Sequence, residues 1–188
     1  MENNKKIIIT FVGMPGAGKS EAVKHLENKG IPFLRFGDVT DDGLRERGLP
    51  RTPENEQVVR ESIRQELGMG AYAIKIQPKL EKLLETNRYV ALDGLYSWEE
   101  YTFLITKFPN LKLIHVYAER ELRHERLLTR DIRPLTIEQA KNRDIAEIEH
   151  LNKGGPIAIA DYLAENDSDK QLFFKKIDGL LTRLGVQI

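Results

Sequence analysis

The stretch Ile7-Ile-Ile-Thr-Phe-Val-Gly-Met-Pro-Gly-Ala-Gly-Lys-Ser20 decides the fold of this chain. Its first six residues are apolar or β-branched without alternation, which predicts a strand buried on both faces, as in a parallel sheet covered by helices. Gly13 to Ser20 then fit the spacing G-x-x-x-x-G-K-[ST]. The residues from Lys19 to about Asn28 predict a helix, so the loop has the strand–loop–helix context of a phosphate-binding motif.

The chemistry of phosphate binding explains this spacing. Glycines let the backbone wrap closely, so that N–H groups and the helix start point at phosphate oxygens. Lys19 can then reach the β- and γ-phosphates, and the Ser20 hydroxyl can hold Mg²⁺. A glycine-rich turn without a ligand is the alternative. The predicted nucleotide-binding positions of the loop are Gly13, Pro15, Gly16, Ala17, Gly18, Lys19, Ser20 and Glu21.

Strand and helix patterns alternate along the rest of the chain, which predicts an α/β fold with right-handed crossovers. Further strands are expected at Pro32 to Phe36, Arg88 to Leu92, Leu111 to Tyr117 and Ile157 to Ala160. Helices are expected at Trp98 to Lys107, Arg120 to Arg130, Ile137 to Leu151 and Lys170 to Leu184.

The region from Val39 to about Thr86 is mainly helical in pattern. Thr52 and Pro53 read as the N-cap and first residue of one helix. A second helix is expected from Ala71 to Glu85, with Pro78 bending or splitting it.

Composition narrows the class of protein. The 188 residues are enough for one compact domain, and 29 basic against 29 acidic residues leave no net charge. The absence of cysteine excludes disulfides and a cysteine nucleophile. Neutral charge argues against a nucleic-acid partner, and no apolar run suggests a membrane span. Without a signal-peptide pattern at the start, we expect a cytoplasmic protein.

Three uses of a P-loop compete. A GTPase would carry a base-reading Asn-Lys-x-Asp, but Asn152-Lys-Gly-Gly155 lacks the aspartate. A motor-like ATPase would end a strand in paired acidic residues, whereas Asp93 is followed by Gly94. A small-molecule kinase needs a compact chain, an acceptor-binding insert and arginines near the phosphates. The sequence offers all three, so it favours a kinase.

Two aspartates follow predicted strands, whose carboxyl ends open onto the ligand crevice of a parallel sheet. Asp93 can bind Mg²⁺ directly or through water. Asp38 lies where an acceptor hydroxyl would bind, so it can orient or deprotonate that hydroxyl. A helix N-cap or a turn residue is the structural alternative for each.

Arginines are dense between Arg120 and Arg130. Arg126 and Arg130 share one helix face, and Arg143 lies on the next helix. Phosphoryl transfer needs positive charge over the γ-phosphate, which a hinged helical flap can bring. The alternative is a solvated helix with glutamates as partners, and it applies most strongly to Arg120 and Arg123.

At this point the motifs resemble those of nucleoside-monophosphate-kinase-like P-loop kinases. Within these kinases the chain is most similar to a mainly archaeal family related to adenylate kinase and dephospho-CoA kinase. The resemblance covers nearly the whole chain. It is carried by Gly13 to Ser20, Gly37-Asp-Val39, Leu92-Asp-Gly94, Arg126-Leu-Leu-Thr-Arg130, Arg143-Asp144, and Ile159-Ala-Asp-Tyr162 with Asn166.

The resemblance implies a three-layer α/β/α fold with a five-stranded parallel sheet. It implies one domain over 1–188, with a helical acceptor lobe around 38–70 and a helical lid around 120–150. ATP and Mg²⁺ would occupy the P-loop. By motif, Arg126 matches the residue that stacks on adenine, and Asn166 matches the loop at the base edge. Arg130 and Arg143 match arginines that contact phosphates.

Two departures from the family pattern lie on the acceptor side. Thr40-Asp41-Asp42 stands where an arginine commonly follows Gly-Asp-Val, and Tyr96 stands where Asp-Gly-x-Arg has arginine. Such arginines often clamp a substrate phosphate. The candidates to replace them are Arg35, Arg45, Arg64 and Lys79.

The leading hypothesis is an ATP-dependent kinase acting on a small-molecule acceptor of the nucleoside monophosphate or dephospho-CoA class. The residues expected to act in transfer are Lys19, Asp38, Arg130 and Arg143. Ser20 and Asp93 are the expected metal ligands. The alternative is an ATP-binding switch or weak ATPase that acts through a macromolecular partner.

Overall fold

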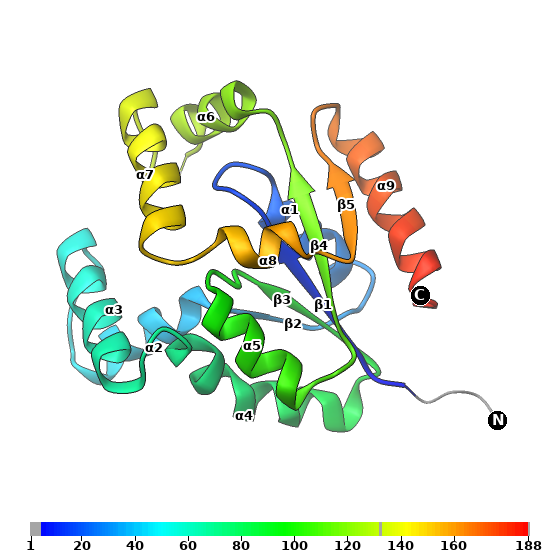
Figure 1. The fold of residues 1–188 in the computed structure, drawn as a ribbon, viewed down its shortest axis with the longest axis horizontal. Helices are drawn as coiled ribbons and strands as arrows, with labels where there is room; N and C mark the ends of the chain where they lie inside the picture. The colour runs from blue at the N-terminus through cyan, green and yellow to red at the C-terminus, as the bar shows by residue number, and fades with distance from the viewer. Residues whose placement is uncertain (1–4, 132, 188) are drawn as a thin grey trace.

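The computed structural model describes residues 5–131 and 133–187. Five parallel strands form one sheet in the order β2-β3-β1-β4-β5, with helices on both faces (Figure 1). The five-stranded parallel sheet and the α/β fold are therefore confirmed. The strands are β1 Ile7–Val12, β2 Phe33–Arg35, β3 Tyr89–Asp93, β4 Leu111–Tyr117 and β5 Tyr162–Glu165.

Helices connect every pair of successive strands. The helices are α1 Lys19–Glu27, α2 Gly37–Glu46, α3 Pro53–Leu67, α4 Ala71–Thr86, α5 Trp98–Lys107, α6 Arg120–Thr129, α7 Ile137–Glu149, α8 Gly154–Ala158 and α9 Lys170–Arg183. The predicted acceptor lobe (38–70) holds α2 and α3, and the predicted lid (120–150) holds α6 and α7. The functions given to these two ranges remain predictions.

The first strand is apolar throughout because both of its faces are buried. Ile8 and Val12 pack into a core with side chains of α3, α4 and α5, whereas Ile9 and Phe11 pack into a second core with α1 and α9. The continuous apolar pattern of Ile7–Val12 is thus explained by helices on both sides.

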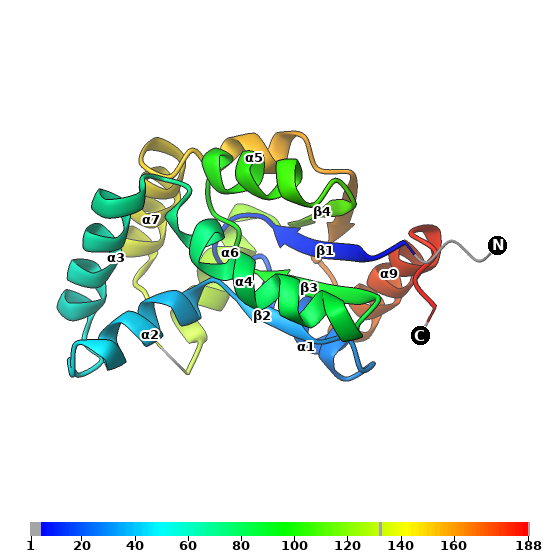
Figure 2. The same cartoon turned by 90° about the horizontal axis from the view of Figure 1, so that it is seen from below.

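The strand order indicates where a ligand crevice is expected. β1 pairs with β3 on one side and β4 on the other, so the chain changes direction across the sheet beside β1. The carboxyl ends of these strands point toward the end of the molecule where α2, α3 and α7 lie (Figure 2). The P-loop and Asp93 open onto this crevice.

The fifth strand is not where the sequence pattern placed it. Ile157 to Ala160 lie in α8 and the turn after it, and β5 begins at Tyr162. The reason is Asp161, whose carboxylate accepts the Leu113 N–H at 2.9 Å and occupies the ladder of β4 just before pairing starts. Asp161 therefore precedes β5 and does not end it.

The predicted start of α3 is confirmed, whereas the predicted break of the next helix at Pro78 is not. Thr52 Oγ1 accepts the Asn55 N–H at 3.2 Å, so α3 begins as predicted with Pro53 at its first position. The sequence predicts that Pro78 bends or splits its helix, but α4 continues from Ala71 to Thr86 with Pro78 inside it. A proline removes only its own N–H from the ladder, and buried neighbours such as Ile76 and Leu80 hold the helix against the core.

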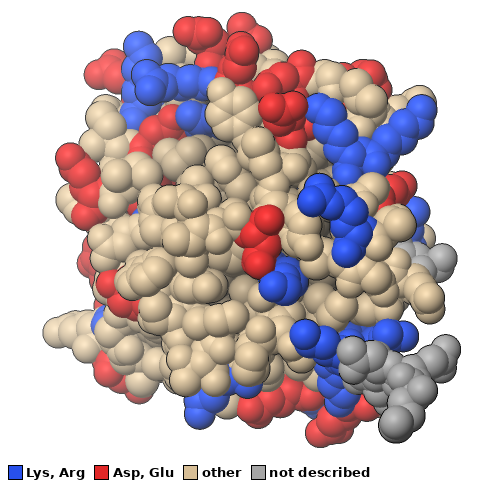
Figure 3. All heavy atoms as spheres, turned by 45° about the vertical axis from the view of Figure 1, so that its right-hand side comes forward, with Lys and Arg blue, Asp and Glu red and all other residues tan. Residues whose placement is uncertain are grey.

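The surface carries charged side chains of both signs, as expected for a chain without net charge. Acidic and basic side chains both border a broad uncharged area on the face shown in Figure 3. Among the residues that the structure describes, no helix is long and apolar enough to cross a bilayer.

Candidate nucleotide-binding site

The P-loop joins β1 to α1 in a conformation that needs glycine. Gly16 and Gly18 have φ values of 78° and 103°, which side-chain-bearing residues rarely adopt. A Cβ at Gly16 would also overlap the backbone of Arg123 in α6. The loop therefore lies directly against the helix that begins the predicted lid.

Lys19 starts α1 and folds back over the loop. Its Nζ donates to Gly13 O at 2.8 Å and Met14 O at 3.0 Å. Burial, with Lys153 as the next cause, lowers the pKa of Lys19 to about 7. The amine thus lies in a crowded, cation-rich place where an anion would be bound favourably.

Ser20 and Asp93 meet across the crevice. Ser20 Oγ donates to Asp93 Oδ2 at 2.9 Å, although 73 residues separate them in sequence. Asp93 is 7 % exposed. Within residues 5–131 and 133–187, no group of three or more His, Asp or Glu side chains could hold a metal. A hydroxyl and one carboxylate are, however, the hard oxygen donors that Mg²⁺ takes when water and phosphate complete its shell, so this pair fits Mg²⁺.

Arg126 and Asn166, which are each predicted to border the adenine, contact one another. Arg126 Nη2 donates to the Asn166 carbonyl at 2.7 Å, and Asn166 Nδ2 donates to Ala17 O at 2.8 Å. Arg126 Nη1 is buried and has no partner in the described part of the chain. Three segments far apart in sequence thus form one wall beside the P-loop, with one guanidinium nitrogen still to be satisfied.

Two other arginines of the predicted lid, Arg130 and Arg143, lie near each other, since the charge of Arg143 acts on Arg130. Arg130 Nε donates to Arg133 O at 2.6 Å, and Arg143 Nε donates to Glu147 at 3.0 Å. Burial, followed by the charges of Arg143 and Arg133, lowers the pKa of Arg130. Glu21, the last predicted loop position, forms an ion pair with Lys170 of α9.

Arg123 is a site residue that the sequence left open. Only 6 % of it is exposed, so a solvated role is wrong for Arg123, whereas Arg120 is exposed. Its Nη1 donates to Pro15 O at 2.8 Å, and its two Nη atoms bond the Asp144 carboxylate at 2.9 and 2.7 Å. Burial alone would raise the pKa of Asp144, but the bonds from Arg123 and His124 lower it. The spacing of Arg123 from the buried Leu127, four residues on, was the available signal.

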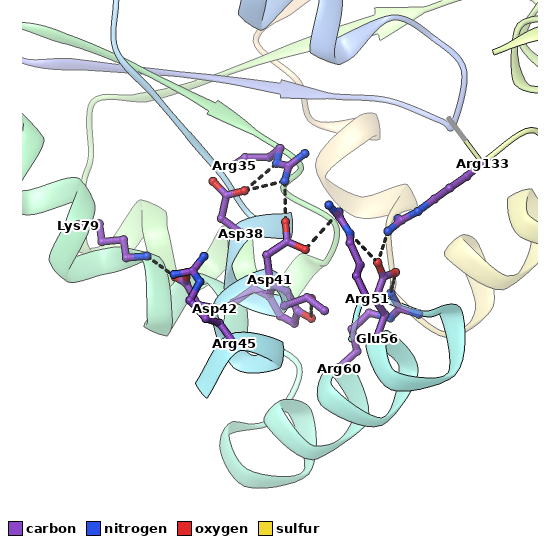
Figure 4. A network of polar contacts seen from close by, with 12 residues as sticks. Arg35, Asp38, Asp41, Asp42, Arg45, Arg51, Glu56, Arg60, Lys79 and Arg133 are labelled. Carbon is purple, nitrogen blue, oxygen red and sulfur yellow. Dashed lines mark hydrogen bonds and ion pairs between the residues drawn. The ribbon is translucent and has the colours of Figure 1, made fainter. Parts of the chain in front are cut away.

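On the acceptor side, most of the cations are already paired (Figure 4). Asp38 is half exposed and accepts Arg35 Nε at 2.8 Å, while Arg35 also bonds Asp41 at 2.8 Å. Asp42 binds both Arg45 and Lys79, at 3.1 and 2.6 Å. Three of the four cations proposed to replace the missing arginines therefore already face carboxylates.

Arg64 differs from those three. Its guanidinium lies 5.2 Å from the centroid of the Tyr72 ring, and its buried Nε has no hydrogen-bond partner in the part of the chain described. Tyr72 is held in turn by a 2.7 Å hydrogen bond to Thr40. Arg64 is thus oriented by an aromatic ring and keeps hydrogen-bonding capacity.

Figure 4 also shows a contact between the predicted lid and the predicted acceptor lobe. Arg133 forms an ion pair with Glu56 of α3, which Arg51 and Arg60 bond at 3.1 and 3.3 Å. Burial would raise the pKa of Glu56, but these arginines lower it. The segment after α6 is thereby tied across the crevice.

Sequence reasoning missed the pair Glu147 and Lys153. Lys153 is 1 % exposed, and its Nζ forms an ion pair with Glu147. Nothing in the local sequence marks Lys153 as buried, because it follows α7 among polar and glycine residues.

A cavity of about 800 Å³ lies beside the phosphate-binding residues. It is lined by residues from the end of β4, from the P-loop and from helices α6, α7 and α8. Met14 and Ala17 border it, whereas Lys19, Ser20 and Asp93 do not line it.

Fold and site together define a P-loop protein with a kinase-like nucleotide-binding fold. The comparisons agree: the described fold resembles shikimate kinase from Bacteroides thetaiotaomicron (TM-score 0.61, 14 % identity, 95 % of this chain and 98 % of that one). It also resembles dephospho-CoA kinase from Campylobacter jejuni (TM-score 0.57, 15 % identity, 95 % and 97 % covered). At these identities the likeness concerns the fold.

The chain belongs to the UPF0200 family. It is 36 % identical over 182 residues to the UPF0200 protein PYRAB09750 of Pyrococcus abyssi (strain GE5 / Orsay). The matched region covers 95 % of this chain and 97 % of the relative. Residues 9–152 match the family described as an AAA domain. The expected relation to an archaeal P-loop family is confirmed, while the relation to adenylate kinase is not among these findings.

Proposed function

We propose that the protein is an ATP-dependent phosphotransferase that acts on a small hydroxyl- or phosphate-bearing acceptor. The observation that carries this proposal is the Ser20–Asp93 bond beside Lys19, with Arg143 of the predicted lid near enough for its charge to act on Lys19. Nucleoside monophosphates and dephospho-CoA are the first candidate acceptors.

The predicted site residues other than Glu21 have roles in this proposal. The P-loop N–H groups and Lys19 bind the triphosphate, and Ser20 with Asp93 would hold Mg²⁺, which offsets negative charge on the phosphates. Arg126 and Asn166 would border the adenine. Arg130 and Arg143 would stabilise charge on the transferred phosphoryl group.

Transfer requires an acceptor oxygen in line with the γ-phosphorus. As that oxygen bonds phosphorus, the bond to the β,γ-bridging oxygen breaks and ADP leaves. Asp38 is the carboxylate proposed to orient the acceptor or take its proton. It is available for this because half of its side chain is exposed, while Arg35 fixes its position.

Arg64 is the cation we assign to the acceptor's anionic group. Arg35, Arg45 and Lys79 would each have to leave a carboxylate first, whereas Arg64 has an unpartnered Nε. A planar guanidinium can bind a phosphate or carboxylate through two parallel hydrogen bonds.

The decisive experiment measures ADP release from Mg-ATP with and without nucleoside monophosphates, nucleosides, shikimate and dephospho-CoA. One compound should stimulate ADP release, and its phosphorylated product should accumulate in equal amount. A Lys19→Ala variant should lose ATP binding and serves as the control for the P-loop. ADP release that no acceptor changes would refute the kinase proposal.

A second function, an ATP-dependent switch, is favoured by one observation. The Arg133–Glu56 pair ties the lid segment to α3, so lid movement would change the surface of the acceptor lobe. In that case ATP would stabilise the protein without any acceptor. Retention of a partner only in the presence of ATP would support it, and retention independent of nucleotide would exclude it.

A further inference from the structure

Lys153 is the most buried lysine in the described part of the chain, and the backbone around it is anchored on both sides. Asn152 donates to Glu99 of α5 at 2.9 Å. Gly155 lies so close to the Trp98 ring that a Cβ would overlap it. Asn152 and Gly155 are thus both held against α5, and the Lys153 side chain between them is buried. Figure 1 shows α8 crossing the sheet between α7 and β5.

The Lys153 side chain ends near the segment that carries Asp93, the proposed metal ligand. Its Nζ lies 4.9 Å from the centroid of the Tyr96 ring. That ring packs over Gly94, with its hydroxyl 3.2 Å from the position of a Cβ there, and Gly94 follows Asp93 directly. Asp93 in turn accepts the Ser20 Oγ–H at 2.9 Å, next to Lys19. Tyr96 and Gly94 therefore connect the Lys153 amine to Asp93, and Asp93 connects it to the P-loop.

The charges around this point do not balance. The cations Lys19, Arg143 and Lys153 lie near the carboxylates Glu147, Asp93 and Asp144. Asp93 is the proposed Mg²⁺ ligand, and Asp144 is already bonded by Arg123 and His124, which leaves Glu147 for these three cations. Arg143 already bonds Glu147, so neutralising Glu147 does not require Lys153. Lys153 is buried whereas Lys19 and Arg143 are partly exposed, and the repulsion among such cations is relieved when an anion binds beside them.

We propose that Lys153 is a second phosphate-binding lysine, whose Nζ contacts the γ-phosphoryl group of the bound nucleotide. Glu147 holds the amine in place until the nucleotide binds and then retains Arg143. The inference rests on the proposed nucleotide-binding function and adds a residue that the P-loop motif does not contain.

The test compares the affinities of ATP and ADP, measured by calorimetry at constant Mg²⁺. If Lys153 contacts the γ-phosphoryl group, Lys153→Met should weaken ATP binding about tenfold or more while ADP binding stays within about twofold. Lys153→Arg should restore most of the difference. Lys112→Met is the matched control, because Lys112 also pairs with a carboxylate, Asp161 at 2.9 Å, but at the start of β4.

Removing Lys153 alone leaves Glu147 with one partner fewer, so folding needs its own control. The double variant Lys153→Met/Glu147→Gln removes both buried charges and should show the same selective loss of ATP affinity, with a normal thermal transition. Equal ATP-to-ADP affinity ratios in the double variant and the wild type would overturn the inference. Failure of the wild type to bind ATP would instead refute the proposed function, so the two failures are distinguishable.

Discussion

Glu100 provides a pH-dependent test of the packing beneath the site. It is fully buried at the start of α5, where its Oε2 accepts the N–H groups of Tyr96 at 2.7 Å and Ser97 at 3.1 Å. Its Oε1 is buried without a partner in the described structure. Burial raises the pKa of Glu100 to about 7, despite the opposing backbone bonds and the charge of Arg64.

The sign of the effect follows from this raised pKa. The ordinary pKa of glutamate is 4.5, so between about pH 4.5 and 7 the unfolded chain ionises while folded Glu100 keeps its proton. Stability is therefore highest below this window and falls as pH rises through it. At about 1.4 kcal/mol per pKa unit, the full loss above pH 7 is about 3 kcal/mol.

Glu100→Gln removes this titration but keeps a carbonyl oxygen for the two backbone N–H groups. Urea denaturation followed by circular dichroism should show the variant more stable than the wild type at pH 8, by up to about 3 kcal/mol, and nearly equal at pH 5. The exposed Glu85→Gln is the control and should not change the pH slope. A variant with the wild-type pH slope, or one less stable at pH 8, would refute the reasoning.

Three further substitutions test the site. Asp93→Asn should reduce the gain in ATP affinity that Mg²⁺ provides by roughly tenfold, measured with Mg²⁺ and with a chelator; an unchanged gain would remove Asp93 from the metal site. Arg123→Met should lower the free energy of unfolding by about 3–5 kcal/mol, because it leaves Asp144 largely uncompensated, and urea midpoints will show whether adding Asp144→Met recovers part of the loss. Arg64→Met should raise the KM for an anionic acceptor about tenfold without changing the KM for ATP, whereas Arg45→Met, at a side chain 77 % exposed, should change neither.

The parts of the fold that could be predicted are those that short stretches of sequence determine. Ile7–Val12 is apolar because both faces are covered, and the glycines after it are required by positive φ angles, so the strand and loop are evident from the sequence. The N-cap at Thr52 is equally local, since its partner is three residues away. Apolar runs, glycines and helix caps can therefore be interpreted without knowledge of the rest of the fold.

The failure at β5 has the opposite cause. Ile157 to Ala160 alternate in a way that fits a strand, but four residues fit a helical turn equally well. What decides between them is the bond from Leu113 to Asp161, which fixes where pairing with β4 begins. That contact joins residues 48 positions apart, so no local pattern could reveal it.

At Tyr96, one part of the local structure could be predicted from the sequence and another part could not. The sequence correctly shows that Tyr96 lacks a guanidinium, yet the structure places the amine of Lys153 over the ring of that same residue. Tyr96 and Lys153 are 57 positions apart in sequence. They come into contact only because α8 packs on α5. A motif that appears incomplete in sequence is therefore not evidence of lost phosphate binding, because a cation that is distant in sequence can lie beside the same position in space.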